Sequence, residues 1–371
     1  MALSDPRVAF GDASPGGPAP VAVSVRPHPG AAAVPAAPAP AGGLEGPLVD
    51  RYGRVHDDLR ISVTDRCNLR CVYCMPEEDM TFLPRAELLS FEEIARLGRV
   101  ARALGVTSVR LTGGEPLVRR NLVDLVALLA GIGFADLSLT TNATLLAPLA
   151  RPLAEAGLTR VNVSCDSLRP ERFAAIRRRG DLATVLGAMD AAEAAGLAPL
   201  KVNVVVLRGE NDDEVLDFAR FARETGRVVR FIEFMPLDAG GHWERDRLVP
   251  GAEVAATIGA HFPLVPLGGH DAAPAERFAF ADGRGEVGFI SSVTQPFCGA
   301  CNRLRLTADG AIRNCLFSDD ELSVRDVMRA GGSDEAVADV LRAAVGAKHP
   351  GHAINEPGFL APRRSMSMIG G

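Results

Sequence analysis

Short runs rich in β-branched residues alternate with longer helical stretches through the first two thirds of the chain, and this alternation limits the folds that it can adopt. The strand-like runs lie at 59–64, 107–112, 136–141, 159–165, 200–207 and 228–234. The helical stretches lie near 90–104, 121–132, 145–156, 170–195 and 211–225, and several are followed by glycine. Regular alternation of this kind predicts a parallel sheet with its helices outside.

The number of strand–helix units favours a partial TIM-type (β/α)6 barrel over a smaller open sheet. In such a barrel, functional side chains are expected at the carboxyl ends of the strands. The rhythm changes after about residue 240, where runs at 286–293 and 303–308, followed by Asp309 and Gly310, predict an antiparallel meander that closes the barrel. The expected organisation is therefore an extension at 1–46, a barrel at 47–240 and a C-terminal region at 241–371.

Composition excludes several classes of protein. Residues 1–46 are rich in Ala, Pro and Gly and are predicted to be disordered, without an assigned function. A net charge of -6 argues against binding to nucleic acid or to a membrane surface, and no apolar run is long enough to span a membrane. The odd number of cysteines, 7, in spacings that make poor disulfide frameworks, predicts a reducing, cytoplasmic location.

Six of the cysteines form two separated triplets, Cys67/Cys71/Cys74 and Cys298/Cys301/Cys315. Iron–sulfur clusters and structural zinc both prefer four protein ligands, so each triplet leaves one metal position open for a substrate. The alternative is a structural zinc protein whose two Cys-x2-Cys arms come from different triplets. That alternative leaves the outer cysteine of each triplet unused and does not explain the barrel.

Two further groups of residues indicate ligand binding. Gly113 and Gly114 follow the second strand, where they permit close backbone approach to a ligand, and Glu115 could accept from an ammonium group. Arginines also occur inside predicted strands, and one of the two lysines of the chain lies in an apolar run. Convergent guanidinium groups suit a polyphosphate. These basic residues are Arg60, Arg110, Lys201, Arg303 and Arg305.

The Cys-x3-Cys-x2-Cys loop, with Tyr73 before its last cysteine, resembles that of the radical S-adenosylmethionine (SAM) superfamily, and the Gly-Gly-Glu-Pro segment resembles its SAM-binding motif. From about Leu59 to Gly371 the order of motifs resembles the GTP 3′,8-cyclase family of molybdenum cofactor biosynthesis. The departures are Ala143, where the family has glycine, and Cys165, where it has leucine. The nearest rival, a peptide-modifying radical enzyme with an auxiliary cluster, would not need the arginine set or the terminal Gly-Gly.

The resemblance implies roles for particular residues. The two cysteine triplets would hold two [4Fe-4S] clusters, and Gly370 and Gly371 would reach into the active site. The residues implied in binding SAM are Tyr73, Gly114, Ser164 and Met235. The residues implied in binding GTP are Arg60, Arg110, Thr141, Lys201, Arg303 and Arg305.

The resemblance also implies a reaction and partners. A deoxyadenosyl radical would abstract hydrogen from C3′ of GTP, and the C3′ radical would attack C8 to give (8S)-3′,8-cyclo-7,8-dihydroguanosine 5′-triphosphate. An electron donor would supply the cluster, and a cyclic pyranopterin monophosphate synthase would receive the product. The sequence leaves open whether the chain forms a homodimer.

Overall fold

One curved sheet organises the molecule. The computed structural model describes residues 44, 46–75, 80–237, 241, 243–268, 272–357 and 359–370. Within them, 12 strands follow the order β12-β11-β10-β1-β2-β3-β4-β5-β6-β9-β8-β7. The strands are β1 (Asp58–Ser62), β2 (Ser108–Thr112), β3 (Asp136–Thr141), β4 (Arg160–Ser164), β5 (Lys201–Val206), β6 (Val228–Glu233), β7 (Leu264–Pro266), β8 (Glu276–Phe280), β9 (Glu286–Ile290), β10 (Arg303–Leu306), β11 (Ala311–Arg313) and β12 (Glu321–Ser323).

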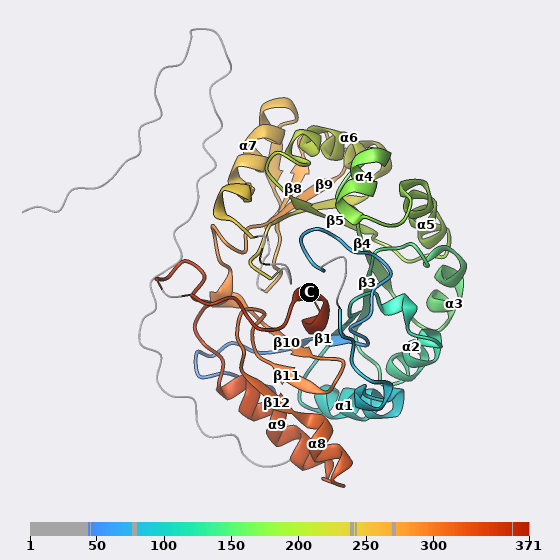
Figure 1. The fold of residues 1–371 in the computed structure, drawn as a ribbon, viewed down its shortest axis with the longest axis vertical. Coiled ribbons are helices and arrows are strands. Elements are labelled where there is room, and N and C mark those ends of the chain that lie inside the picture. The colour runs from blue at the N-terminus through green and yellow to red at the C-terminus, as the bar shows by residue number, and fades with distance from the viewer. Residues whose placement is uncertain are drawn as a thin grey trace, which may run out of the picture.

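Helices cover the outside of the curved sheet, and the C-terminal end of the chain lies at its centre (Figure 1). They are α1 (Phe91–Ala103), α2 (Leu122–Ala130), α3 (Ala150–Glu155), α4 (Pro170–Arg177), α5 (Leu182–Ala194), α6 (Val215–Thr225), α7 (Gly251–His261), α8 (Val324–Arg329), α9 (Asp334–Gly346) and α10 (Met366–Ile369). The predicted partial barrel is confirmed. Strands β1 to β6 match the six predicted runs and pair in parallel in chain order.

The local pattern of β1 shows how the sequence builds this barrel. Leu59 and Ile61 are fully buried in the main hydrophobic core, whereas Arg60 between them lines a cavity on the other face. Side chains alternate across a strand, so a run that is apolar on one face and polar on the other separates the core from the barrel interior. The interior is therefore polar.

The predicted antiparallel C-terminal strands are confirmed for the hairpin of β10 and β11 across Asp309 and Gly310, but the runs 286–293 and 303–308 do not pair with each other. β9 pairs in parallel with β6 and β10 pairs in parallel with β1, so the two runs extend opposite edges of the barrel sheet. The remaining short strands are antiparallel to their neighbours, with β7 on β8, β8 on β9, β11 on β10 and β12 on β11. Both edge strands of the six-stranded core thus gain a parallel partner that satisfies their backbone hydrogen bonds.

The predicted helix at 170–195 is two helices. Helix α4 ends at Arg177 and is capped by Arg178, which has a left-handed φ of 59°, and Gly180 is also left-handed. Helix α5 then starts with its own cap, because the Asp181 side chain accepts from the Thr184 amide. The C-terminal end of α4 contacts the first cysteine loop, where the Arg177 carbonyl accepts from the Arg70 amide.

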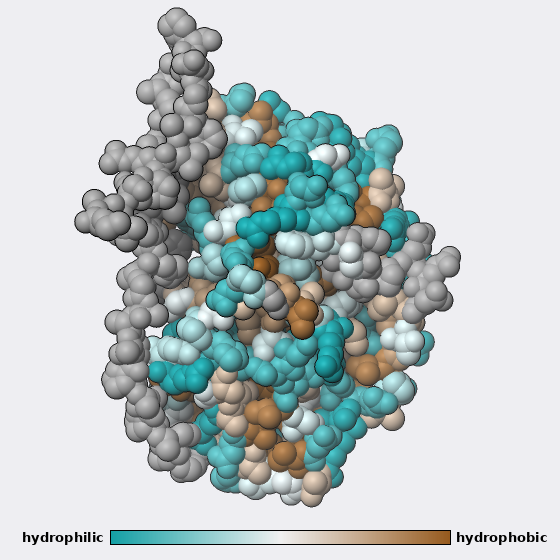
Figure 2. Space-filling model, turned by 60° about the vertical axis from the view of Figure 1, so that its left-hand side comes forward, coloured by the Kyte–Doolittle hydropathy of each residue, from teal (hydrophilic) through white to brown (hydrophobic). Residues whose placement is uncertain are grey.

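The face of the molecule drawn in Figure 2 is mainly polar. Figure 2 shows one face on which hydrophilic side chains predominate and apolar ones are scattered. No helix in the described parts of the chain combines the length and apolar character needed to cross a membrane. The predicted extension at 1–46 lies almost wholly outside the described residues.

Candidate active site

The first cysteine triplet lies on the loop that follows β1. This loop packs against the end of α4, where the amides of Arg70 and Val72 donate to the carbonyls of Arg177 (3.2 Å) and Ile176 (3.0 Å). The Cys71 sulfur accepts from Nη1 of Arg177 at 3.3 Å. Burial raises the pKa of the Cys67 thiol to about 11. Thiols held in such surroundings stay protonated until a metal displaces the proton.

The Gly-Gly-Glu segment after β2 braces the stretch before this loop. The amides of Gly114 and Glu115 donate to the carbonyls of Thr64 and Arg66, each at 2.8 Å. A Cβ on Gly114 would lie 2.4 Å from the Arg66 carbonyl oxygen, and one on Gly113 would lie 2.5 Å from that of Thr64. These glycines therefore permit close approach to the cysteine-loop backbone, a role that the sequence did not reveal.

Glu115 is 1% exposed, and its carboxylate accepts hydrogen bonds from other residues of the chain. Its carboxylate accepts from the Thr141 hydroxyl (2.7 Å) and from the amides of Asn142 (2.7 Å) and Leu117 (3.0 Å). Burial nevertheless raises its pKa to about 7, against the effect of these hydrogen bonds. The carboxylate thus joins the ends of β2 and β3. Thr141, which was predicted to bind GTP, does not line the barrel cavity; its neighbour Thr140 does.

The other residues predicted to contact SAM lie along the same rim. Ser164 ends β4, and Met235 follows β6 and lines the cavity. The hydroxyl of Tyr73 donates to Oδ2 of Asp166 at 2.8 Å, just beyond the end of β4. The barrel therefore brings Gly114, Ser164, Met235 and the cysteine loop to one end, as expected for the carboxyl ends of parallel strands.

A cavity of about 150 Å³ lies inside the barrel between a basic cluster and the second cysteine triplet. Arg60 is in register with Arg110 on one side and with Arg305 on the other. Burial is the largest cause that lowers the pKa of Arg305 to about 10, and repulsion by a neighbouring arginine is the next. The same two causes lower the pKa of Arg60. Buried cations with so few carboxylates nearby favour an anionic ligand. The basic residues that line the cavity are Arg60, Arg110, Arg230, Arg303 and Arg305.

Arg230 was missed in the sequence. It lies in β6, and its guanidinium donates to the side-chain oxygens of Asn203 and Asn162, both at 2.9 Å. Burial lowers its pKa to about 9. An arginine within a run of Val, Phe and Ile was the available signal, the same one that marked Arg60 and Arg110.

Lys201 does not line the cavity. It is the first residue of β5, at the strand end away from the cysteine loop. Burial and nearby Arg230 lower its pKa to about 8. It adds to the positive potential of the barrel interior from the opposite end.

The second cysteine triplet faces the same cavity from the C-terminal region. Nη2 of Arg303 donates to the Cys301 sulfur at 3.3 Å, and Nζ of Lys348 donates to the carbonyls of Arg303 (2.8 Å) and Asn314 (2.7 Å). Although burial opposes ionisation, Arg303 and Lys348 lower the pKa of Cys301 to about 6. This thiol is thus prepared to bind a metal as a thiolate.

The C-terminal tail enters the barrel. Nη1 of Arg305 donates to the Gly370 carbonyl at 2.6 Å, and Met366 lines the cavity. Gly370 has a φ of +67°, and a Cβ there would lie 2.4 Å from the Thr112 hydroxyl. Gly370 is therefore inside the barrel, whereas Gly371 lies outside the described residues.

The side-chain chemistry of both triplets fits iron–sulfur clusters. Each triplet offers three free thiols, and in each an arginine donates a hydrogen bond to one of the sulfurs. Among the described residues, no three His, Cys, Asp or Glu side chains already lie close enough to hold a single metal ion. The cluster assignment therefore depends on the cysteine pattern and on the family.

Comparison with known proteins agrees with this site. Residues 61–222 match the radical SAM superfamily, and residues 227–354 match the Molybdenum Cofactor Synthesis C family. The fold resembles that of Streptococcus suis SuiB, with a TM-score of 0.57 and 13% identity over 82% of this chain and 69% of that one. A partial barrel with a three-cysteine loop after its first strand defines a radical SAM protein.

Relatives narrow the class further. The chain is 49% identical over 330 residues to the GTP 3′,8-cyclase of Rhodopirellula baltica. The matched region covers 87% of this chain and 92% of that protein. It is 50% identical over 333 residues to GTP 3′,8-cyclase 2 of Mycobacterium tuberculosis, with 88% and 92% covered. The chain belongs to the GTP 3′,8-cyclase family.

Proposed function

We propose that this chain cyclises GTP to (8S)-3′,8-cyclo-7,8-dihydroguanosine 5′-triphosphate, the first step of molybdenum cofactor biosynthesis. The observation that carries the proposal is the arginine-lined cavity between the two cysteine triplets. Its five guanidinium groups match a triphosphate in charge and in hydrogen-bonding geometry. A peptide substrate would not require them.

Cys67, Cys71 and Cys74 would hold a [4Fe-4S] cluster, with SAM bound near Tyr73, Gly114, Ser164 and Met235. When bound, this pair supplies the radical that removes the C3′ hydrogen of GTP. The residues of the chain do the positioning. Arg60, Arg110 and Arg305 would fix the phosphates, and the brace between Gly114 and the cysteine loop would hold the rim in place.

Cys298, Cys301 and Cys315 would hold a second [4Fe-4S] cluster, and three protein ligands would leave one iron available to bind the guanine. Its support is the position of all three cysteines on the cavity wall and the low pKa of Cys301. Arg303 contacts the Cys301 sulfur and also lines the cavity, so it would connect cluster and substrate. Lys201 and Thr141 would act less directly, from behind the residues that line the cavity.

The tail and the partners complete the proposal. Gly370, held by Arg305, and Gly371 would approach the bound substrate, so that tail and nucleotide share the barrel. An electron donor would reduce the clusters, and the product would pass to a cyclic pyranopterin monophosphate synthase. We also propose a cytoplasmic location and the division at residue 240.

The test is anaerobic incubation of reconstituted protein with GTP, SAM and dithionite. Deoxyadenosine and the cyclised nucleotide should appear in a one-to-one ratio, measured by liquid chromatography and mass spectrometry. Cys67→Ala should abolish both products. Formation of deoxyadenosine with no cyclised nucleotide would reject the proposal.

A further inference from the structure

A buried ion pair behind the first cysteine loop has no role in the reaction as described so far. Arg177, the last residue of α4, pairs with Asp166, and Nη2 and Oδ2 are 2.7 Å apart. The two side chains are 3% and 1% exposed. Nη1 of the same guanidinium donates to the Cys71 sulfur at 3.3 Å. One buried cation thus joins a carboxylate to a cysteine of the first triplet.

The same two residues hold the loop at other points. The Arg177 carbonyl accepts from the Arg70 amide at 3.2 Å, and Asp166 accepts from the Tyr73 hydroxyl at 2.8 Å. Residues on both sides of Cys71 are therefore fixed to the Arg177–Asp166 pair. Movement of the pair would move the Cys71 sulfur.

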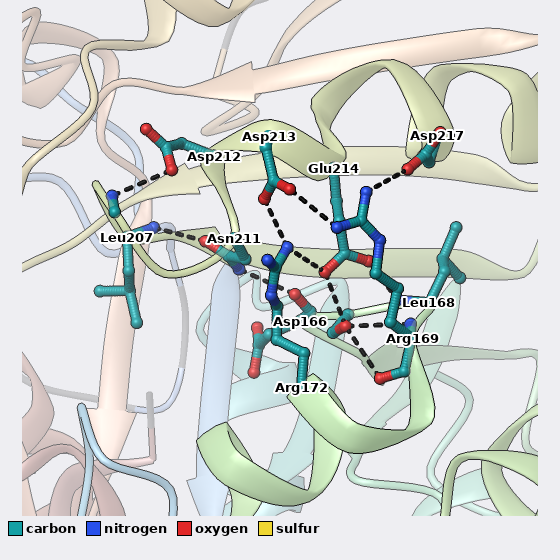
Figure 3. A network of polar contacts seen from close by, with 12 residues as sticks. Asp166, Leu168, Arg169, Arg172, Leu207, Asn211, Asp212, Asp213, Glu214 and Asp217 are labelled. Carbon is teal, nitrogen blue, oxygen red and sulfur yellow. Dashed lines mark hydrogen bonds and ion pairs between the residues drawn. The ribbon is translucent and has the colours of Figure 1, made fainter.

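Asp166 is itself held by the protein. Its Oδ1 accepts from the Val205 amide at 2.9 Å, and its carbonyl accepts from the Asn211 side chain at 2.7 Å. Figure 3 shows Asp166 beside Asn211, and next to them the buried Glu214 carboxylate, which binds the residues that follow Asp166. Glu214 accepts from the Ser167 hydroxyl and the Leu168 amide, each at 2.7 Å. The Asp166 carboxylate is therefore fixed from β5, and the backbone around it is fixed by Asn211 and Glu214, which precede α6.

Arg177 remains charged in this setting. Its Nη2 lies 2.7 Å from the Asp166 carboxylate, and an arginine in such a buried ion pair keeps its positive charge. Its buried Nε has no hydrogen-bond partner among the described residues. The guanidinium therefore keeps a donor available in addition to the one that it gives to Cys71.

We propose that Arg177 is a positioning residue that raises the reduction potential of the cluster held by Cys67, Cys71 and Cys74. Reduction adds one electron, and therefore negative charge, to that cluster. A fixed cation hydrogen-bonded to a ligating sulfur stabilises the reduced form. Asp166 opposes this effect in part while holding Arg177 in place. The inference depends on the proposed function only in assuming a cluster at this site.

The test is a redox titration of the reconstituted full chain, monitored by electron paramagnetic resonance on the signal that changes when SAM is added. Arg177→Met should disfavour reduction about tenfold, which is about 59 mV for one electron. Asp166→Asn removes the opposing charge and should shift the potential upward. Arg177→Lys should lie between Arg177→Met and the unsubstituted chain. Arg179→Gln is the matched control, because it removes an exposed positive charge two residues away and should shift the equilibrium less than twofold.

The direction of the shift in reduction potential distinguishes an electrostatic effect from structural damage. Opposite shifts for Arg177→Met and Asp166→Asn support the proposal, whereas shifts in the same direction, or none with full iron content, overturn it. If Arg177→Met retains no iron, Arg177→Lys takes its place. Opposite shifts in reduction potential for Arg177→Lys and Asp166→Asn then support the proposal, and shifts in the same direction overturn it. Absence of any reducible SAM-sensitive cluster in the unsubstituted protein would instead reject the cluster assignment.

Discussion

The arginines of the cavity destabilise the protein before any ligand binds. Arg60 is half-buried beside Arg110 and Arg305, and its buried Nε has no hydrogen-bond partner among the described residues. The same charges become favourable once a triphosphate lies among them. Stability and function are therefore opposed at this residue.

Arg60→Met should reverse that balance. Replacing a half-buried cation that neighbouring arginines repel by an apolar side chain should raise the free energy of unfolding by about 1 kcal/mol. Losing a charged hydrogen bond should weaken GTP binding about tenfold or more. Denaturant titration and equilibrium dialysis measure the two effects, with exposed Arg179→Gln as control. Unchanged GTP affinity would contradict the phosphate role.

Cys67 and Cys301, one cysteine from each triplet, should differ in their response to pH. Burial favours the neutral thiol in both, but Arg303 and Lys348 lower the pKa of Cys301 to about 6, whereas that of Cys67 rises to about 11. In metal-free protein, alkylation of Cys301 should rise to half its maximum near pH 6 and stay high above it. Cys67 should still be mostly unreactive at pH 7. Peptide mass spectrometry measures both sites, and matching pH profiles would contradict the assignment.

At the scale of elements, the loop after β2 is a structural brace for the cysteine loop. Gly114→Ala would bring a Cβ against the Arg66 carbonyl oxygen, an approach that backbone cannot relieve without moving the loop. The expected result is a loss of about 3 kcal/mol of stability and loss of iron from the first site only. Calorimetry and iron analysis check it.

The control for this substitution is Gly187→Ala. Gly187 is exposed within α5, and its Cβ would meet nothing within 4 Å. Alanine there should stabilise the helix by about 0.5–1 kcal/mol. Equal effects of the two substitutions would show that the brace is unimportant.

Sequence patterns predict elements well where the information is local. The six strands of the barrel were recognisable because β-branched runs and helical periodicity recur along the chain. The partners of β9 and β10 were not recognisable, because pairing with β6 and β1 depends on contacts between distant residues. For the same reason the cysteines and most arginines could be identified, but not the bonds of Glu115 to Thr141 or of Arg177 to Cys71.

At the scale of the whole molecule, the region after residue 240 completes the barrel. It supplies β9 and β10, which pair with β6 and β1, and it supplies the second cysteine triplet and the tail. A fragment of residues 47–240 would expose both edges of the core sheet.

That fragment should fail to unfold cooperatively by circular dichroism and should aggregate. Within the described part of the 1–46 extension, Leu44 packs against the main core. Residues 47–371 should therefore lose only a small part of the stability of the full chain. A fragment of 47–240 with a sharp, reversible transition would show instead that the barrel is an independent domain.

The central claim is that a radical generated at the Cys67 site acts on GTP held among the arginines near the Cys298 site. The most direct measurement is turnover of GTP deuterated at C3′, followed by mass spectrometry of the products. The account predicts deoxyadenosine carrying the deuterium, together with a cyclised nucleotide that has lost it. Deoxyadenosine without deuterium would contradict the account.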